Sequence, residues 1–172
     1  MKIIGIVEIV RKNGLPTFSC EPRNQSIFRE QHWMTSKGFL MSELTQQDIA
    51  AIADRYAAAW LSHDPGAIVA MHAPHSSFQA HGRGAEVKGK DALLKEFAEV
   101  FERYPGFGVE THRLLLGDKH WTLEWDLTFQ PPGKARRGFR ALDVVEVDDA
   151  GLVTRKDTFF DFAQVKAAFE AA

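Results

Sequence analysis

An acidic side chain stands in the middle of an otherwise apolar predicted strand, residues 139–147. Alternate residues of a strand share one face, so Asp143 shares its face with apolar neighbours only: Phe139, Ala141, Val145 and Val147. An ionised carboxylate is unstable in apolar surroundings, so Asp143 is expected either to stay protonated or to pair with another group. A protonated carboxyl group could donate a hydrogen bond in catalysis. A position near the sheet edge, within reach of water or a lysine, would need no function.

The elements that must position Asp143 are predicted in a segregated order. Helical periodicity comes first, and a period of two follows it. Helices are predicted at residues 45–63, 64–74 and 90–103, strands at 76–80, 109–116, 120–129, 139–147 and 152–162, and a short final helix at 163–171. Helices followed by a series of antiparallel strands indicate an α+β fold. A strongly twisted sheet that curls around the first helices would leave a cone-shaped hollow.

The composition is that of one soluble globular domain. The chain has 172 residues, 45% of them hydrophobic, and a net charge of −2, with no basic stripe that would indicate nucleic acid binding. The single cysteine, Cys20, excludes an internal disulfide and suits a reducing cytosol. No stretch reaches the ~20 apolar residues that span a bilayer. We therefore expect a cytoplasmic protein without a membrane partner.

Residues 1–41 differ in character from the rest of the chain. They mix Pro, Arg, Asn, Gln, Ser and isolated aromatic residues without a sustained period, so we expect a poorly structured N-terminal extension with at most a short strand at residues 3–10. Because Met41 is also a natural start, part of this extension could come from an upstream start codon. The ordered domain is expected to occupy residues 42–172.

Several short motifs occur in an order that carries a family resemblance, although none of them is diagnostic alone. They are ADRYAAAW at residues 53–60, HDPGAI at 63–68, VKGKDAL at 87–93, LDVVEV at 142–147 and RKDTFFD at 155–161. Together they resemble the nuclear transport factor 2-like superfamily, on its SnoaL-like polyketide cyclase and ketosteroid isomerase side, over residues 45–165. The resemblance implies a curved antiparallel sheet wrapped around the N-terminal helices into a cone-shaped roll, and a homodimer as in relatives.

The resemblance also implies roles for three positions. Ketosteroid isomerases bind an oxyanion between a tyrosine of the first helix and a protonated Asp of a later strand, and these positions fall on Tyr56 and Asp143. Their general base, an Asp on an early strand, falls on Ala80, so ketosteroid isomerase activity itself is not expected. The alternative for Tyr56 and Asp143 is a hydrogen bond that merely satisfies two buried polar groups.

Lys156 competes with Tyr56 as the partner of Asp143. A period of two places Lys156, Thr158 and Phe160 on the same concave side as Asp143. An ion pair with Lys156 would leave the acid ionised, and the pair would then be structural or would bind a polar group of a ligand.

A histidine is the candidate for the missing general base, because imidazole titrates near neutral pH. His81 is preferred, since its loop is expected to border the mouth of the cone, and a surface histidine without a role is the alternative. The spacing of His72, His75 and His81 fits no standard zinc site, so no metal is expected.

Aromatic side chains would either line the cone as a pocket or fill it as core. The expected ligand-binding residues are Trp60, Phe78, Phe97, Trp125, Lys156 and Phe160. One hypothesis is a cofactor-independent enzyme of isomerase or cyclase type that acts on a small hydrophobic carbonyl compound. The other is a non-catalytic module for ligand binding or dimerisation. A cone filled solidly by Trp60, Trp121 and Trp125 would exclude the enzyme hypothesis.

Overall fold

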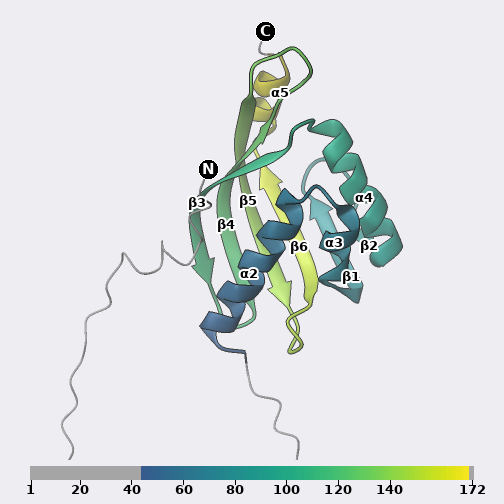
Figure 1. Cartoon of the computed structure of the whole chain (residues 1–172), viewed down its shortest axis with the longest axis vertical. Coiled ribbons are helices and arrows are strands. Elements are labelled where there is room, and N and C mark those ends of the chain that lie inside the picture. The colour runs from purple at the N-terminus through teal and green to yellow at the C-terminus, as the bar shows by residue number, and fades with distance from the viewer. Residues whose placement is uncertain (1–43, 171–172) are drawn as a thin grey trace, which may run out of the picture. The chain divides into compact units, whose positions relative to one another are not determined.

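The computed structural model describes residues 44–170, and Figure 1 shows their arrangement. Helices α2 (Gln46–Leu61), α3 (Pro65–Ala70) and α4 (Lys90–Arg103) lie over one face of a curved six-stranded sheet. This arrangement confirms the predicted α+β class and the wrapping of the sheet around the N-terminal helices. The extension and the short strand predicted within residues 1–41 lie outside the described residues.

Helix α2 begins at a capping box formed by Thr45 and Asp48. The Thr45 hydroxyl accepts a hydrogen bond from the Asp48 N–H, and the Asp48 carboxylate accepts one from the Thr45 N–H at 2.8 Å, which satisfies two N–H groups at the helix start. The buried face of the helix consists of Ile49, Ile52, Ala53, Tyr56 and Trp60. This stripe holds the helix against the concave face of the sheet and carries Tyr56 into the interior.

The sheet is mixed rather than purely antiparallel. Its strands are β1 (His72–Ala80), β2 (Val87–Lys88), β3 (Gly108–Leu116), β4 (His120–Phe129), β5 (Arg137–Val147) and β6 (Val153–Phe160). The spatial order is β2-β1-β6-β5-β4-β3, and strands β3 to β6 form the predicted antiparallel series. Strand β1 pairs with β6 in parallel, because the chain leaves β1 and returns to its other side only after α4 and three more strands.

Strand β1 also begins earlier than the sequence predicts. The second helix ends at Ala70 instead of Pro74, and β1 starts at His72 instead of Ser76. Proline lacks an N–H and clashes with the preceding turn of a helix, so Pro74 is accommodated in an irregular part of the strand. The register of β1 against β6 shifts between His72 and Ser77. The longer strand brings His72 into the interior.

The final helix, α5 (Phe162–Glu170), packs at one end of the sheet next to β5. Within residues 44–170, no helix has the length and apolar character needed to span a bilayer.

Candidate functional site

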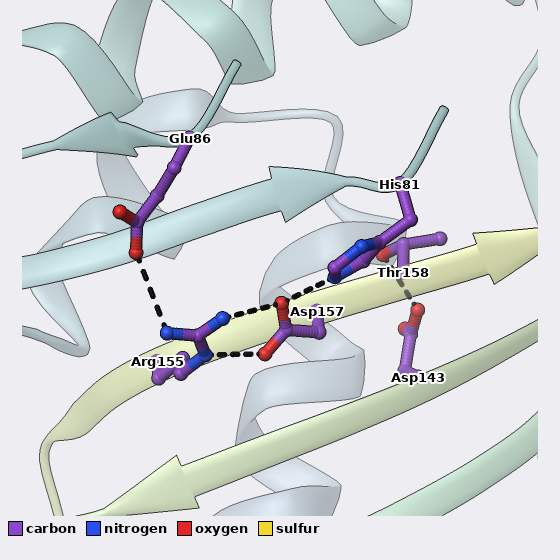
Figure 2. Close-up of polar contacts among 6 residues, drawn as sticks. All are labelled: His81, Glu86, Asp143, Arg155, Asp157 and Thr158. Atoms are coloured by element: carbon purple, nitrogen blue, oxygen red, sulfur yellow. Dashed lines mark hydrogen bonds and ion pairs between the residues drawn. The ribbon is translucent and has the colours of Figure 1, made fainter. Parts of the chain in front are cut away.

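Asp143 lies on the concave face of the sheet, as the alternation of β5 predicts. The register places it opposite Thr158 of β6 and Leu123 of β4, and its residue is only 6% exposed. The Thr158 hydroxyl donates a hydrogen bond of 2.7 Å to Oδ1, which Figure 2 shows, and Oδ2 forms an ion pair with Nζ of Lys156. Of the two partners that the sequence left open, Lys156 therefore contacts Asp143 directly.

Lys156 is as deeply buried as its partner. It is 4% exposed, and its Nζ lies 5.7 Å from the ring centre of Trp60 and 6.0 Å from that of Phe78. Burial lowers the pKa of Lys156, and the negative charge of Asp143 opposes this shift. The interior thus holds an ion pair whose cation also rests on two aromatic faces.

Tyr56 contacts a histidine instead of Asp143. Its hydroxyl oxygen lies 2.9 Å from Nε2 of His72, whose Nδ1 lies 2.8 Å from Oγ of Ser76. Two proton arrangements satisfy both contacts. Either Tyr56 donates to Nε2 and Nδ1–H donates to Ser76, or Ser76 donates to Nδ1 and Nε2–H donates to Tyr56. In the second arrangement the phenolic O–H stays available for a ligand.

Burial keeps both of these groups neutral at pH 7. Burial, together with the positive charges of Lys156 and Lys90, lowers the pKa of His72 to about 3. Burial likewise raises the pKa of Tyr56 far above its usual range, and the charge of Asp143 adds to this rise. A neutral phenol and a neutral imidazole therefore lie next to a charged pair in the same interior.

Aromatic rings surround these polar groups. The ring centre of Phe97 lies 4.9 Å from that of Trp60 and 5.3 Å from that of Phe78. Trp125 packs against Phe107. Its indole N–H is buried without a hydrogen-bond partner among the described residues. The indole N–H of Trp60 lies beside the Tyr56 hydroxyl without the geometry of a hydrogen bond.

The three tryptophan side chains of the cone are all buried. Trp60, Trp121 and Trp125 are 8%, 2% and 6% exposed. Their burial favours the non-catalytic alternative without showing that the cone is solidly filled, and a ligand that reaches Lys156 has to be small or has to displace aromatic side chains. Phe160, the remaining expected pocket residue, is half-buried and packs between Phe139 and Phe162.

His81 lies on the other face of the sheet. Its Nε2 is 2.7 Å from Oδ1 of Asp157, and its ring stacks on Phe159 with 4.1 Å between ring centres. Figure 2 shows that Arg155 holds the same carboxylate and reaches Glu86. Because Asp157 alternates with Lys156 and Thr158 along β6, the sheet separates His81 from Asp143.

Comparison with known proteins gives the family. The model of the SnoaL-like domain family matches residues 53–156, more than half of the chain. The chain belongs to the SnoaL-like domain family. Its fold is that of the nuclear transport factor 2-like superfamily, as the sequence resemblance predicts. Among curated proteins, none matches the sequence.

Solved structures share the fold of this SnoaL-like domain at low sequence identity. A protein with a ketosteroid isomerase-like fold from Catenulispora acidiphila, in complex with trimethylamine, is 18% identical, with a TM-score of 0.61 over 68% of this chain and 90% of that chain. SalBIII, an epoxide hydrolase/cyclase-like enzyme of pyran ring formation in salinomycin, is 19% identical. Its TM-score is 0.61, over 70% of this chain and 97% of SalBIII. A SnoaL-like polyketide cyclase from Shewanella putrefaciens is 12% identical. Its TM-score is 0.64, over 74% of this chain and 86% of the cyclase.

His72 is the site residue of this SnoaL-like domain that sequence reasoning missed. The sequence offered His72 only as one of the histidines for the base, behind His81, and as a member of a zinc set with non-standard spacing. Within residues 44–170, no three His, Cys, Asp or Glu side chains gather as a metal site. Strict alternation along β1 could not place His72, because the register shift between His72 and Ser77 breaks the period. The available signal was Pro74 two residues later, since proline disfavours a helix at and just before its position.

Proposed function

We propose that this SnoaL-like protein is a cofactor-independent enzyme that moves a proton on a small hydrophobic carbonyl compound, the chemistry of isomerases and cyclases. The observation that carries the proposal is the Tyr56–His72 contact of 2.9 Å, buried beside the Asp143–Lys156 pair. A core that needed only to be filled would use hydrocarbon side chains, because buried ionisable groups are costly. The family match and the fold shared with a cyclase-like enzyme support a small-molecule reaction.

Each polar group has a role in this proposal. Ser76 and His72 orient Tyr56, so that its O–H donates to the carbonyl oxygen of the ligand. The Lys156 ammonium stabilises the negative charge that develops on that oxygen. Asp143 takes a proton from the carbon next to the carbonyl and returns it to the product. Asp143 thereby supplies the base that Ala80 does not provide.

In the same proposal, the apolar walls of the site are formed by five aromatic side chains, Trp60, Phe78, Phe97, Trp125 and Phe160. Their packing restricts the ligand to a small compound, which contacts the rings while its oxygen reaches Tyr56. His81 has no direct part in the proton transfer, since it pairs with Asp157 across the sheet.

Proton exchange tests the proposal without knowledge of the natural substrate. Small ketones and aldehydes, such as cyclohexanone and phenylacetaldehyde, are incubated with the protein in D₂O, and deuterium incorporation next to the carbonyl is followed by NMR. Exchange above the buffer rate that falls in Tyr56→Phe and Asp143→Asn is the expected result. Exchange at the buffer rate for every probe would reject the enzyme.

The burial of Trp60, Trp121 and Trp125 favours a second candidate, a non-catalytic ligand-binding or dimerisation module. Quenching of tryptophan fluorescence by the same probes, without any proton exchange, would support ligand binding alone.

We further propose a cytoplasmic homodimer. The sheet face opposite the helices carries Leu142, Val144 and Phe159, which are half-buried or exposed, and a partner could cover them. Light scattering of the purified protein measures the oligomeric state, and a monomer at micromolar concentration would contradict the dimer.

A further inference from the structure

Lys156 combines three features that a lysine chosen only for its charge does not need. It is 4% exposed, its Nζ faces the rings of Trp60 and Phe78, and its ion-pair partner is a carboxylate that can receive its proton. Arginine serves better as a permanent buried cation, because its guanidinium stays charged and forms two hydrogen bonds with a carboxylate. A lysine in this position can also become a neutral amine.

We propose that Lys156 is a nucleophile that forms an imine with the carbonyl carbon of a small aldehyde or unhindered ketone. This inference rests on the proposed function, since it requires a carbonyl compound to reach the interior. It extends that function, because the ligand would be bound covalently to Lys156 during the reaction. The ligand class narrows to carbonyl compounds whose carbon is open to attack.

The first step is a proton transfer inside the pair. Lys156 gives one proton to Asp143, which leaves a neutral amine and a neutral carboxyl group. The transfer keeps the net charge of the pair unchanged, and a poorly solvated pair exchanges two buried charges for none. The low-polarity surroundings that lower the pKa of Lys156 favour the amine. Thr158 holds the other oxygen of Asp143 at 2.7 Å and keeps the carboxyl group oriented during this transfer.

The second step makes the carbon–nitrogen bond. The Nζ lone pair attacks the carbonyl carbon, and the oxygen, aided by the Tyr56 O–H, becomes the hydroxyl of a carbinolamine after a proton moves to it from nitrogen. Asp143 then returns its proton to that hydroxyl, which leaves as water, and the nitrogen lone pair forms the iminium ion. The products are an iminium on Lys156, an Asp143 carboxylate and one water molecule. The ion pair is thereby restored.

The iminium gives the covalent route its chemical advantage. Its positive nitrogen withdraws electrons from the neighbouring carbon, so the restored Asp143 carboxylate can remove a proton there to form an enamine. Where the ligand carries a carbon–carbon double bond next to that carbon, the enamine extends to a dienamine. Return of the proton to the far end of the dienamine, followed by hydrolysis, would release a carbonyl compound with the double bond moved. The same two residues thus act first in bond formation and then in proton transfer.

Reduction with borohydride traps an imine as a stable secondary amine. The full-length protein is incubated with phenylacetaldehyde or cyclohexanone, treated with sodium borohydride, and analysed by intact mass and by peptide mapping. We expect one reduced adduct per chain, located on Lys156. The matched surface control is Lys88→Ala, since Lys88 has a side chain that is 67% exposed, and this variant should be labelled as the wild type is.

The variant Lys156→Arg separates the covalent route from the proposed function. Arginine keeps the positive charge beside Asp143 but forms no such imine, so we expect at least a 100-fold loss of proton exchange with circular dichroism unchanged.

The other outcomes separate the two proposals. Proton exchange retained in Lys156→Arg, or adducts only on other lysines, would overturn the inference while the proposed function stands. Adduct on Lys156 without any exchange supports the nucleophile and rejects the proposed turnover. Absence of both rejects both. If Lys156→Arg does not fold, the peptide map of the wild type decides.

Discussion

Lys156 and Asp143 pair across two neighbouring strands, β6 and β5, on the face of the sheet that the helices cover. The register places Thr158 directly opposite Asp143, and Lys156 two residues earlier on β6 reaches the same carboxylate diagonally. Both members of the pair are buried, so neither charge has water to replace a lost partner. The pair therefore connects the stability of the domain to its proposed chemistry.

Removal of one partner should destabilise the domain strongly. Lys156→Met leaves an unpaired buried carboxylate, and a loss of about 3–5 kcal/mol in the free energy of unfolding is expected. The double variant Asp143→Leu with Lys156→Met leaves no charge behind and should be more stable than Lys156→Met alone. Urea unfolding measures both. Lys166→Ala is the control, because its pair with Glu170 is exposed on both sides and should contribute little. A single variant within about 1 kcal/mol of the wild type would contradict this expectation.

Tyr56→Phe should affect activity far more than Tyr104→Phe. The first change removes the proposed donor to the ligand oxygen and should reduce proton exchange about 100-fold. It also deprives His72 of a buried partner, which should lower the free energy of unfolding by about 1–3 kcal/mol. Tyr104 is equally buried, but its hydroxyl accepts a hydrogen bond from Arg83 and does not contact the site. Proton exchange by NMR and urea unfolding are measured for both variants. Equal exchange rates in Tyr56→Phe and Tyr104→Phe would refute Tyr56 as the donor to the ligand oxygen.

Stability should fall on acidification because of His72. The pKa of His72 is about 3 in the folded chain against an ordinary value of 6.5. Below pH 6.5 the unfolded chain therefore takes up a proton at His72 that the folded chain does not. The contribution of His72 is complete above pH 6.5 and is lost as the pH falls toward 3, by about 1.4 kcal/mol per pH unit. Urea unfolding of the wild type and of His72→Gln at several pH values isolates the contribution of His72 to the pH dependence of stability. If the free energy of unfolding changes with pH equally in the wild type and in His72→Gln, the result would contradict a buried neutral imidazole.

His81→Ala decides between His81 and Asp143 as the general base. The sequence predicts His81 as the base, whereas the sheet separates it from Asp143. We expect wild-type proton exchange in His81→Ala, and a loss of about 1 kcal/mol in stability from the hydrogen bond to Asp157. A drop in exchange comparable to that of Tyr56→Phe would restore His81 as the base.

The local elements could be predicted because their causes are local. The capping box at Thr45 and Asp48 sets the start of α2, and Asp64 with Pro65 sets the start of α3. The change to a period of two marks β3 to β6 within two residues of their observed bounds. The parallel pairing of β1 with β6 has no such local cause, since it joins strands separated by most of the domain.

The sequence alone determined the family, the α+β class and the face of β5 on which Asp143 lies, because periodicity and short motifs are properties of neighbouring residues. Only the tertiary structure decided that Asp143 pairs with Lys156, that Tyr56 turns to His72 and that His81 lies across the sheet. Alternation tells which face a side chain occupies, but not which partner it reaches on that face. That choice depends on the register of β6 against β5 and on how α2 packs over the sheet, and both are set by contacts far apart in the chain.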